Sequence, residues 1–142
     1  MPIAKLVSSP IAATEHADAV LELAFVVSAV DGHLADEELA AFGELVGCVR
    51  GRAVTKEEVD DLLGRFLVAA QSTPGEARVR ELGTALPGEL RELAFKVAVG
   101  LTLVDREENE HEDDLVGLLA ATLGLAERSI PLTAEARAAF GE

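Results

Sequence analysis

Apolar residues return every three or four positions along most of this chain. The residues Leu39, Phe42, Val46 and Val49 show the spacing, which places apolar side chains along one face of a helix. No convincing strand pattern is present. The spacing therefore predicts an all-α protein of about seven helices. The first is expected from Pro10 to about Val30, the second begins near Asp36, and the third runs from after Thr55 to about Ala70. The fourth is expected from Thr73-Pro74 to Pro87-Gly88, the fifth over about 89–104, the sixth over about 110–123, and a short seventh begins at Thr133.

Local signals mark several of these helix ends. Ser9 followed by Pro10 is typical of a capping residue and the first helical position, with a break near Thr14 as the alternative. Thr55-x-x-Glu58 has the form of a capping box. Glycines at 32 and 124 are well placed to end the first and sixth helices.

The sequence "ELAF" occurs twice, at Glu22–Phe25 and at Glu92–Phe95. Each copy is followed by an apolar run and then by a cluster of acids. This duplication predicts two pseudo-repeats, about 10–70 and 74–140, divided near Gln71–Glu76. Because each half is too small to bury its own aliphatic core, we expect one domain over residues 1–142 with the halves packed together.

The two acid clusters align on their leading aspartates, Asp31 and Asp105. Both read D-x4-[DE]-x-E, which pairs Glu38 with Glu112. The second cluster holds seven acids in the ten residues Asp105–Asp114. Like charges packed this densely repel unless solvent or a cation neutralises them. A hard divalent ion needs several oxygen ligands from more than one segment, and two acidic loops on one side of a helical bundle could supply them.

Helix capping is the alternative reading of these acids. Acidic residues are favoured in the first turn of a helix, and "VTKEEV" at Val54–Val59 has the same form with no site implied. For Glu38 and Glu112 taken singly, capping is the simpler explanation. Capping does not require the aspartates at 31 and 105, which end the preceding apolar runs.

Composition limits the function further. The formal net charge is −14, so nucleic acid and anionic membrane surfaces are poor partners, whereas cations and a basic protein partner are suitable. The longest apolar runs, Phe25–Val30 and Val97–Val104, are too short to span a bilayer, and the first ten residues lack the apolar core of a signal peptide. One cysteine, Cys48, allows no intrachain disulfide, which favours a cytoplasmic location.

The sequence lacks the usual marks of an enzyme. It has no P-loop, dinucleotide fingerprint or nucleophile elbow, so a non-catalytic protein is expected. The acidic loops are not EF-hands, because His33 and Ala35 occupy positions where that loop supplies oxygen ligands. The three histidines show no ligand-pair spacing and Cys48 has no partner, so Zn²⁺ is disfavoured relative to Ca²⁺, Mg²⁺ or Mn²⁺.

The stretches "SAVDGHLADEELAAF" (Ser28–Phe42) and "LVDREENEHEDDLVGLLAATLGL" (Leu103–Leu125) resemble the two signatures of TerB-like tellurite-resistance domains. The resemblance covers nearly the whole chain. It implies an all-α fold of two related halves, an accessory role in tellurite or chemical stress response, and a metal-binding acidic face. On this chain the implied ligands are Asp31, Glu38, Asp105 and Glu112. The second loop departs from the first in having Arg106 where the first has Gly32, and this guanidinium could partly replace a cation.

The sequence therefore supports two competing hypotheses about function. One is a non-catalytic domain that binds a divalent cation through both acidic loops, in stress response or metal sensing. The other is a metal-free interaction module whose acidic face docks a basic protein. The separation of the Asp31 and Asp105 carboxylates would distinguish a shared site from separate surface acids.

Overall fold

A computed structural model describes residues 5–7, 10–28, 36–102 and 110–139, with side chains omitted over 110–114. Over this part of the chain the regular structure is entirely helical, which confirms the all-α prediction. The elements are α1 (Thr14–Ser28), α2 (Asp36–Arg50), α3 (Lys56–Ser72), α4 (Gly75–Ala85), α5 (Gly88–Thr102), α6 (Glu110–Thr122), the short 3₁₀ turn η2 (Ala126–Arg128) and α7 (Ser129–Ala139).

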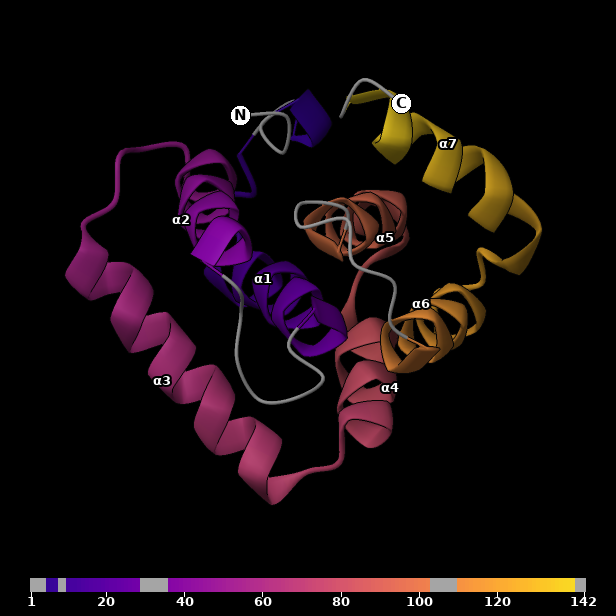
Figure 1. The fold of residues 1–142 in the computed structure, drawn as a ribbon, viewed down its shortest axis with the longest axis horizontal. Helices are drawn as coiled ribbons and strands as arrows, with labels where there is room; N and C mark the ends of the chain where they lie inside the picture. The colour runs from indigo at the N-terminus through magenta and orange to yellow at the C-terminus, as the bar shows by residue number, and fades with distance from the viewer. Residues whose placement is uncertain (1–4, 8–9, 29–35, 103–109, 140–142) are drawn as a thin grey trace.

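Helices α1 and α5 pack against each other at the centre of the fold (Figure 1). Every residue of α1 from Ala19 to Ser28 is buried, and so is nearly all of α5 from Ala94 onward. A helix that is apolar on all sides must be surrounded by other helices. Accordingly, α2, α3, α4 and α6 all contact α1, while α2, α6 and α7 contact α5.

The two predicted pseudo-repeats thus share one core, because α1 and α5 come from different halves of the chain. That the halves are repeats of each other stays a prediction. Aromatic contacts join three helices of the first half: the ring of Phe66 in α3 lies 5.8 Å from that of Phe25 and 6.3 Å from that of Phe42, the latter edge-on. Such contacts add to the stability gained by burying the rings. In the described part of the chain, no helix has both the length and the apolar character needed to cross a bilayer.

Two predicted helix ends are confirmed in detail. The Thr55 hydroxyl accepts a hydrogen bond from the backbone N–H of Glu58 at 3.2 Å, so Thr55 caps α3. Helix α6 ends in a Schellman motif in which Gly124 adopts a positive φ of 72°. In this motif the N–H of Leu125 donates to the carbonyl of Ala120 at 2.8 Å.

Two other predicted starts are wrong. Helix α1 begins at Thr14, where the alternative break was expected, rather than at Pro10. The segment before it is held against the end of α2, where the N–H of Ile11 donates to the Val49 carbonyl at 2.8 Å. Helix α7 begins at Ser129, four residues before Thr133. Its first turn contains Pro131, which is tolerated there because the first N–H groups of a helix have no helical acceptor.

Candidate functional site

The structure describes the four predicted metal ligands unequally. Asp31 and Asp105 lie outside the described residues. Glu112 lies in α6, but its side chain is also outside the description. Glu38 lies in the first turn of α2, and the position and burial of its side chain are described. The proximity of the two aspartates therefore stays a prediction. Glu38 is the one predicted ligand whose side chain is placed by the structure.

Glu38 is buried, with only 3% of its surface exposed, while its neighbours Asp36 and Glu37 are exposed. Glutamate is rarely buried to this extent without a partner or a bound ion, because removing a carboxylate from water is costly. The position equivalent to Glu38 in α3 is Glu58, whose side chain is 36% exposed and pairs with Arg52 at 3.0 Å. The two first turns share a sequence pattern, yet Glu38 does not behave as an ordinary surface acid at a helix start.

Ser28 borders the first acidic segment from its other side. It is the last residue of α1 and is 3% exposed. Among the described residues its hydroxyl oxygen has no hydrogen-bond partner. A buried hydroxyl usually finds one, since an unmade hydrogen bond destabilises a protein by about 1–3 kcal/mol. Two buried oxygen-bearing side chains therefore border the segment 29–35 on both sides.

The helix ends that carry the two acidic stretches face the same side of the molecule. In Figure 1 the C-terminal ends of α1 and α5 and the N-terminal ends of α2 and α6 point toward the viewer. The packing agrees with this view, because α1 contacts both α2 and α6, and α5 contacts the same two helices. Within the described residues there is no cluster of three or more His, Cys, Asp or Glu side chains that could hold a metal.

Sequence reasoning missed a buried ion pair between α1 and α4. The guanidinium of Arg78 contacts both carboxylate oxygens of Glu22, through Nε to Oε2 and through Nη2 to Oε1 at 2.8 Å. The Glu22 side chain is 8% exposed, and the pair raises the pKa of Arg78 above its usual value, mainly through the hydrogen bond to Glu22. An acid within the otherwise apolar "AVLELAFVV" was the signal that could have revealed it.

The corresponding acid of the second "ELAF", Glu92, has a different environment. Its side chain is 44% exposed and pairs with Arg128 at 3.4 Å. The two copies of the motif therefore place their glutamates in unlike surroundings, one inside the bundle and one at its surface.

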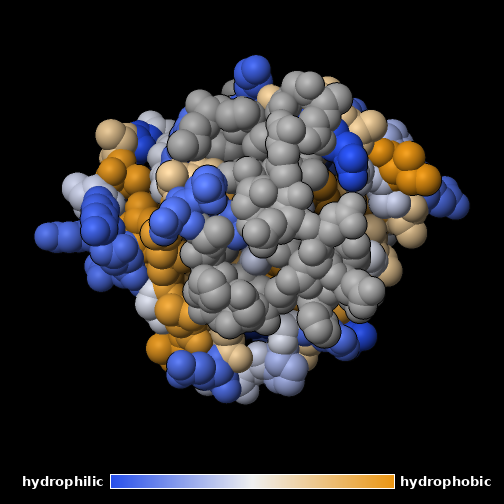
Figure 2. All heavy atoms as spheres, in the orientation of Figure 1, coloured by the Kyte–Doolittle hydropathy of each residue, from blue (hydrophilic) through white to orange (hydrophobic). Residues whose placement is uncertain are grey.

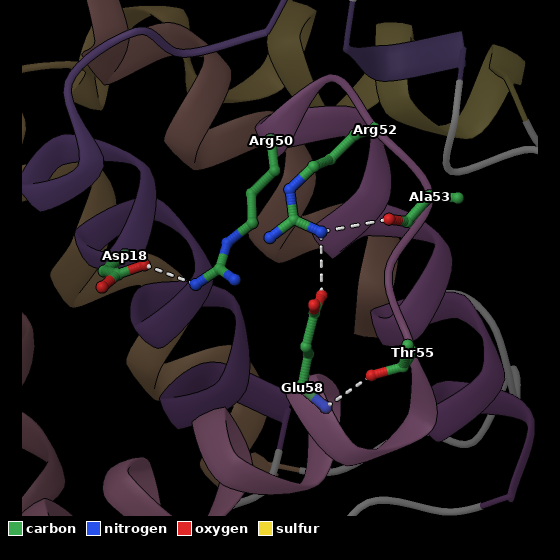
Figure 3. Close-up of polar contacts among 6 residues, drawn as sticks. All are labelled: Asp18, Arg50, Arg52, Ala53, Thr55 and Glu58. Carbon is green, nitrogen blue, oxygen red and sulfur yellow. Dashed lines mark hydrogen bonds and ion pairs between the residues drawn. The ribbon is translucent and has the colours of Figure 1, made fainter.

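Basic side chains gather at the opposite end of α2 from Glu38. The Nη2 of Arg50 lies 3.4 Å from Oδ1 of Asp18 in α1, and Arg65 approaches the other oxygen of the same carboxylate at 3.7 Å. Arg52 donates through Nη1 to Glu58 at 3.0 Å and to the carbonyl of Ala53 at 3.1 Å (Figure 3). This arginine cluster stands out in a chain of net charge −14.

A family model described as tellurite resistance protein TerB matches residues 17–134. The chain belongs to the TerB family. This confirms the resemblance drawn from the two acidic stretches. Comparison with curated proteins and with solved structures produced no match.

The TerB match includes both acidic stretches, the Glu22–Arg78 pair and the buried Glu38. It starts after the segment from Pro10 to Thr14 that packs on the end of α2.

Proposed function

We propose that this TerB-family chain is a non-catalytic domain that binds a divalent cation at its acidic helix ends, as part of a response to tellurite or related chemical stress. The stress role is supported by the description of the family, tellurite resistance protein TerB. The cation is supported chiefly by one observation, the burial of Glu38 beside the first acidic segment. A buried carboxylate suits a cation ligand, because a bound cation would help to stabilise its desolvated charge.

The ligand chemistry favours a hard ion. Glu38 would contribute carboxylate oxygens from α2, and Ser28 could contribute a hydroxyl oxygen from α1. Asp31, Asp105 and Glu112 are the proposed remaining ligands. An all-oxygen set of this kind suits Ca²⁺, Mg²⁺ or Mn²⁺ better than Zn²⁺, which prefers nitrogen and sulfur. The common orientation of the helix ends supports a site shared by both stretches.

Calorimetric titration of chelator-treated full-length protein with Ca²⁺, Mg²⁺, Mn²⁺ and Zn²⁺ tests the proposal. Saturable binding is expected for one or more of the first three ions, and it should be lost when Asp31→Asn is combined with Asp105→Asn. Glu58→Gln is the matched control, because it removes one charge from the equivalent helix position outside the site. No binding at about 1 mM metal, the weak end of protein Ca²⁺ sites, would contradict the proposal.

A metal-free interaction module is the second candidate. It is favoured by the exposure of Asp36 and Glu37 at the start of α2, where a basic protein could reach them. Figure 2 shows hydrophilic residues at the surface in this region. Its association should slow steeply as salt is added, since electrostatic attraction accelerates the encounter.

Cross-linking capture at low ionic strength with a chelator present separates this candidate from the first. A specific partner should be lost with Asp36→Asn plus Glu37→Gln and retained with Glu57→Gln plus Asp60→Asn. The control pair removes two exposed charges from α3 instead. A partner that needs added metal, or that ignores the α2 substitutions, counts against the module.

A further inference from the structure

A small polar pocket of about 300 Å³ opens where the start of α1 meets the end of α2. It lies at the other end of α2 from Glu38 and shares no residue with the proposed cation site. Its lining consists of Ile11, Ala12, Thr14, Ala17, Arg50 and Arg52. Two of the chain's twelve lysines and arginines thus face one pocket.

Close backbone packing forms the walls of this pocket. The segment before α1 is tied to α2 by the hydrogen bond from Ile11 to Val49. Gly51 turns the chain just after α2 with a φ of 73°, and a methyl group there would lie 2.6 Å from Cγ of Pro10. The two walls are therefore joined by a main-chain hydrogen bond and by the close approach of the Pro10 ring to Gly51, so the pocket does not depend on a ligand to form.

The guanidinium groups of Arg50 and Arg52 turn toward the same space in Figure 3. In the described part of the chain, the hydrogen bonds of each group use only one nitrogen, Nη2 of Arg50 and Nη1 of Arg52. The remaining N–H groups are donors that suit an anion. Two like charges side by side repel, and an anion between them would relieve that repulsion.

The acids that pair with these two arginines lie outside the pocket lining. Asp18 is shared between Arg50 and Arg65, at the long separations of 3.4 and 3.7 Å. Glu58 contacts Arg52 from α3, and its carboxylate is not part of the pocket lining. The pocket lining itself carries two positive charges, no carboxylate, and the hydroxyl-bearing Thr14.

We propose that this pocket binds a small oxyanion of the phosphate type. Arginine matches such groups because its planar fork can donate two hydrogen bonds to two oxygens of the anion. The pocket volume accommodates an inorganic anion or the phosphate end of a larger molecule. Binding involves only Arg50, Arg52 and Thr14, so it is independent of the cation site at the other end of α2.

Isothermal titration with inorganic phosphate at constant ionic strength, with chloride as the balancing salt, tests this assignment. Arg52→Gln is the main variant, since its partner Glu58 is partly exposed and the loss of such a pair is expected to have only a small effect on stability. We expect phosphate affinity to fall about tenfold or more, the effect of losing charge-assisted hydrogen bonds. Circular dichroism confirms that the variant folds.

Arg65→Gln is the matched control. It removes one positive charge from a residue that pairs with Asp18, as Arg50 does, but that does not line the pocket. Phosphate binding should change by less than about threefold, because only screened, longer-range attraction is lost. An equal loss of binding in both variants would show general electrostatics and overturn the assignment, as would the absence of saturable binding at about 10 mM phosphate.

A parallel titration with adenosine monophosphate distinguishes the two sources of the anion. Tighter binding than inorganic phosphate, still dependent on Arg52, assigns the pocket to the phosphate end of a larger ligand. If adenosine monophosphate binds more weakly than inorganic phosphate or equally well, and its binding still depends on Arg52, the pocket is assigned to a free oxyanion. Nucleotide binding that survives Arg52→Gln occurs elsewhere and contradicts this site.

Discussion

Arg78 of α4 donates hydrogen bonds to both carboxylate oxygens of Glu22 and so joins α4 to α1 through residues that are 56 positions apart. Arg78 also pairs with Glu81 one turn along its own helix at 3.1 Å. Glu22 is the only acid within the apolar face of α1, and its pair with Arg78 helps to position α4 against α1.

Replacing Arg78 with Met should destabilise the fold strongly, since it leaves the Glu22 carboxylate buried without its cation. Breaking a buried pair in this way costs about 3–5 kcal/mol, and the partial exposure of Arg78 favours the lower figure. Urea denaturation followed by circular dichroism measures the change. Arg128→Met breaks the exposed pair with Glu92 and should cost less than about 1 kcal/mol. Similar losses from both variants would mean that Glu22 is not dependent on Arg78.

A second prediction concerns the two glycines with positive φ, Gly51 and Gly124. Alanine at either position must adopt a left-handed conformation, which costs about 1–2 kcal/mol. At Gly51 the new methyl group also meets Pro10, whereas at Gly124 it meets open space. Gly51→Ala should therefore lower the free energy of unfolding more than Gly124→Ala does. Equal losses would indicate that the segment before α1 moves aside freely.

Gly64 is a position where alanine should stabilise the protein instead of destabilising it. It lies inside α3 without a positive φ, and a methyl group there meets no atom within 4 Å. Gly64→Ala should stabilise the protein by about 0.5–1 kcal/mol, because alanine has the higher helix propensity. The same urea experiment measures it, and a loss of stability would contradict the described surroundings of α3.

Cys48 is expected to react slowly with thiol reagents. Burial, followed by the negative charge of Glu44, raises the pKa of its thiol, so less thiolate is present at any given pH than for an exposed cysteine. Labelling with a disulfide reagent across pH 7–10 should give a midpoint above that of glutathione. Glu44→Gln should lower the midpoint only partly, since burial is the larger cause. A midpoint equal to that of glutathione would refute the raised pKa.

Local sequence signals predicted much of this fold. The periodic apolar residues and the caps at Thr55 and Gly124 act within one or two turns of chain, so they could be recognised without a structure. The start of α1 at Thr14 was expected only as an alternative break, because the preceding segment is held by a hydrogen bond from Ile11 to Val49 in a different part of the chain. The start of α7 was missed because Pro131 is compatible with both a first turn and the end of a loop.

The candidate sites show the same division. The acidic stretches were evident from the sequence, but first-turn acids are normally exposed, so nothing local distinguished buried Glu38 from partly exposed Glu58. The partner of Glu22 was equally hidden, since apolar spacing does not identify which distant arginine meets a buried acid. The pocket at Arg50 and Arg52 arises from the meeting of two helix ends, and its existence depends on tertiary packing.

The last prediction concerns metal-dependent stability and the carboxylate of Glu38. A ligand that binds only the folded state stabilises it by about 2.7 kcal/mol at one hundred times its dissociation constant. If Glu38 is a ligand, a saturating concentration of the ion that binds should raise the unfolding free energy of the wild type. Glu38→Gln keeps the shape of the side chain but removes its charge, so most of that increase should disappear. Glu58→Gln, at the equivalent position of α3, should keep the full increase.

Urea denaturation with metal and with chelator gives the difference for each protein, which cancels any effect of the substitution on the metal-free fold. An equal metal-dependent increase in all three proteins would show that Glu38 is buried for structural reasons alone.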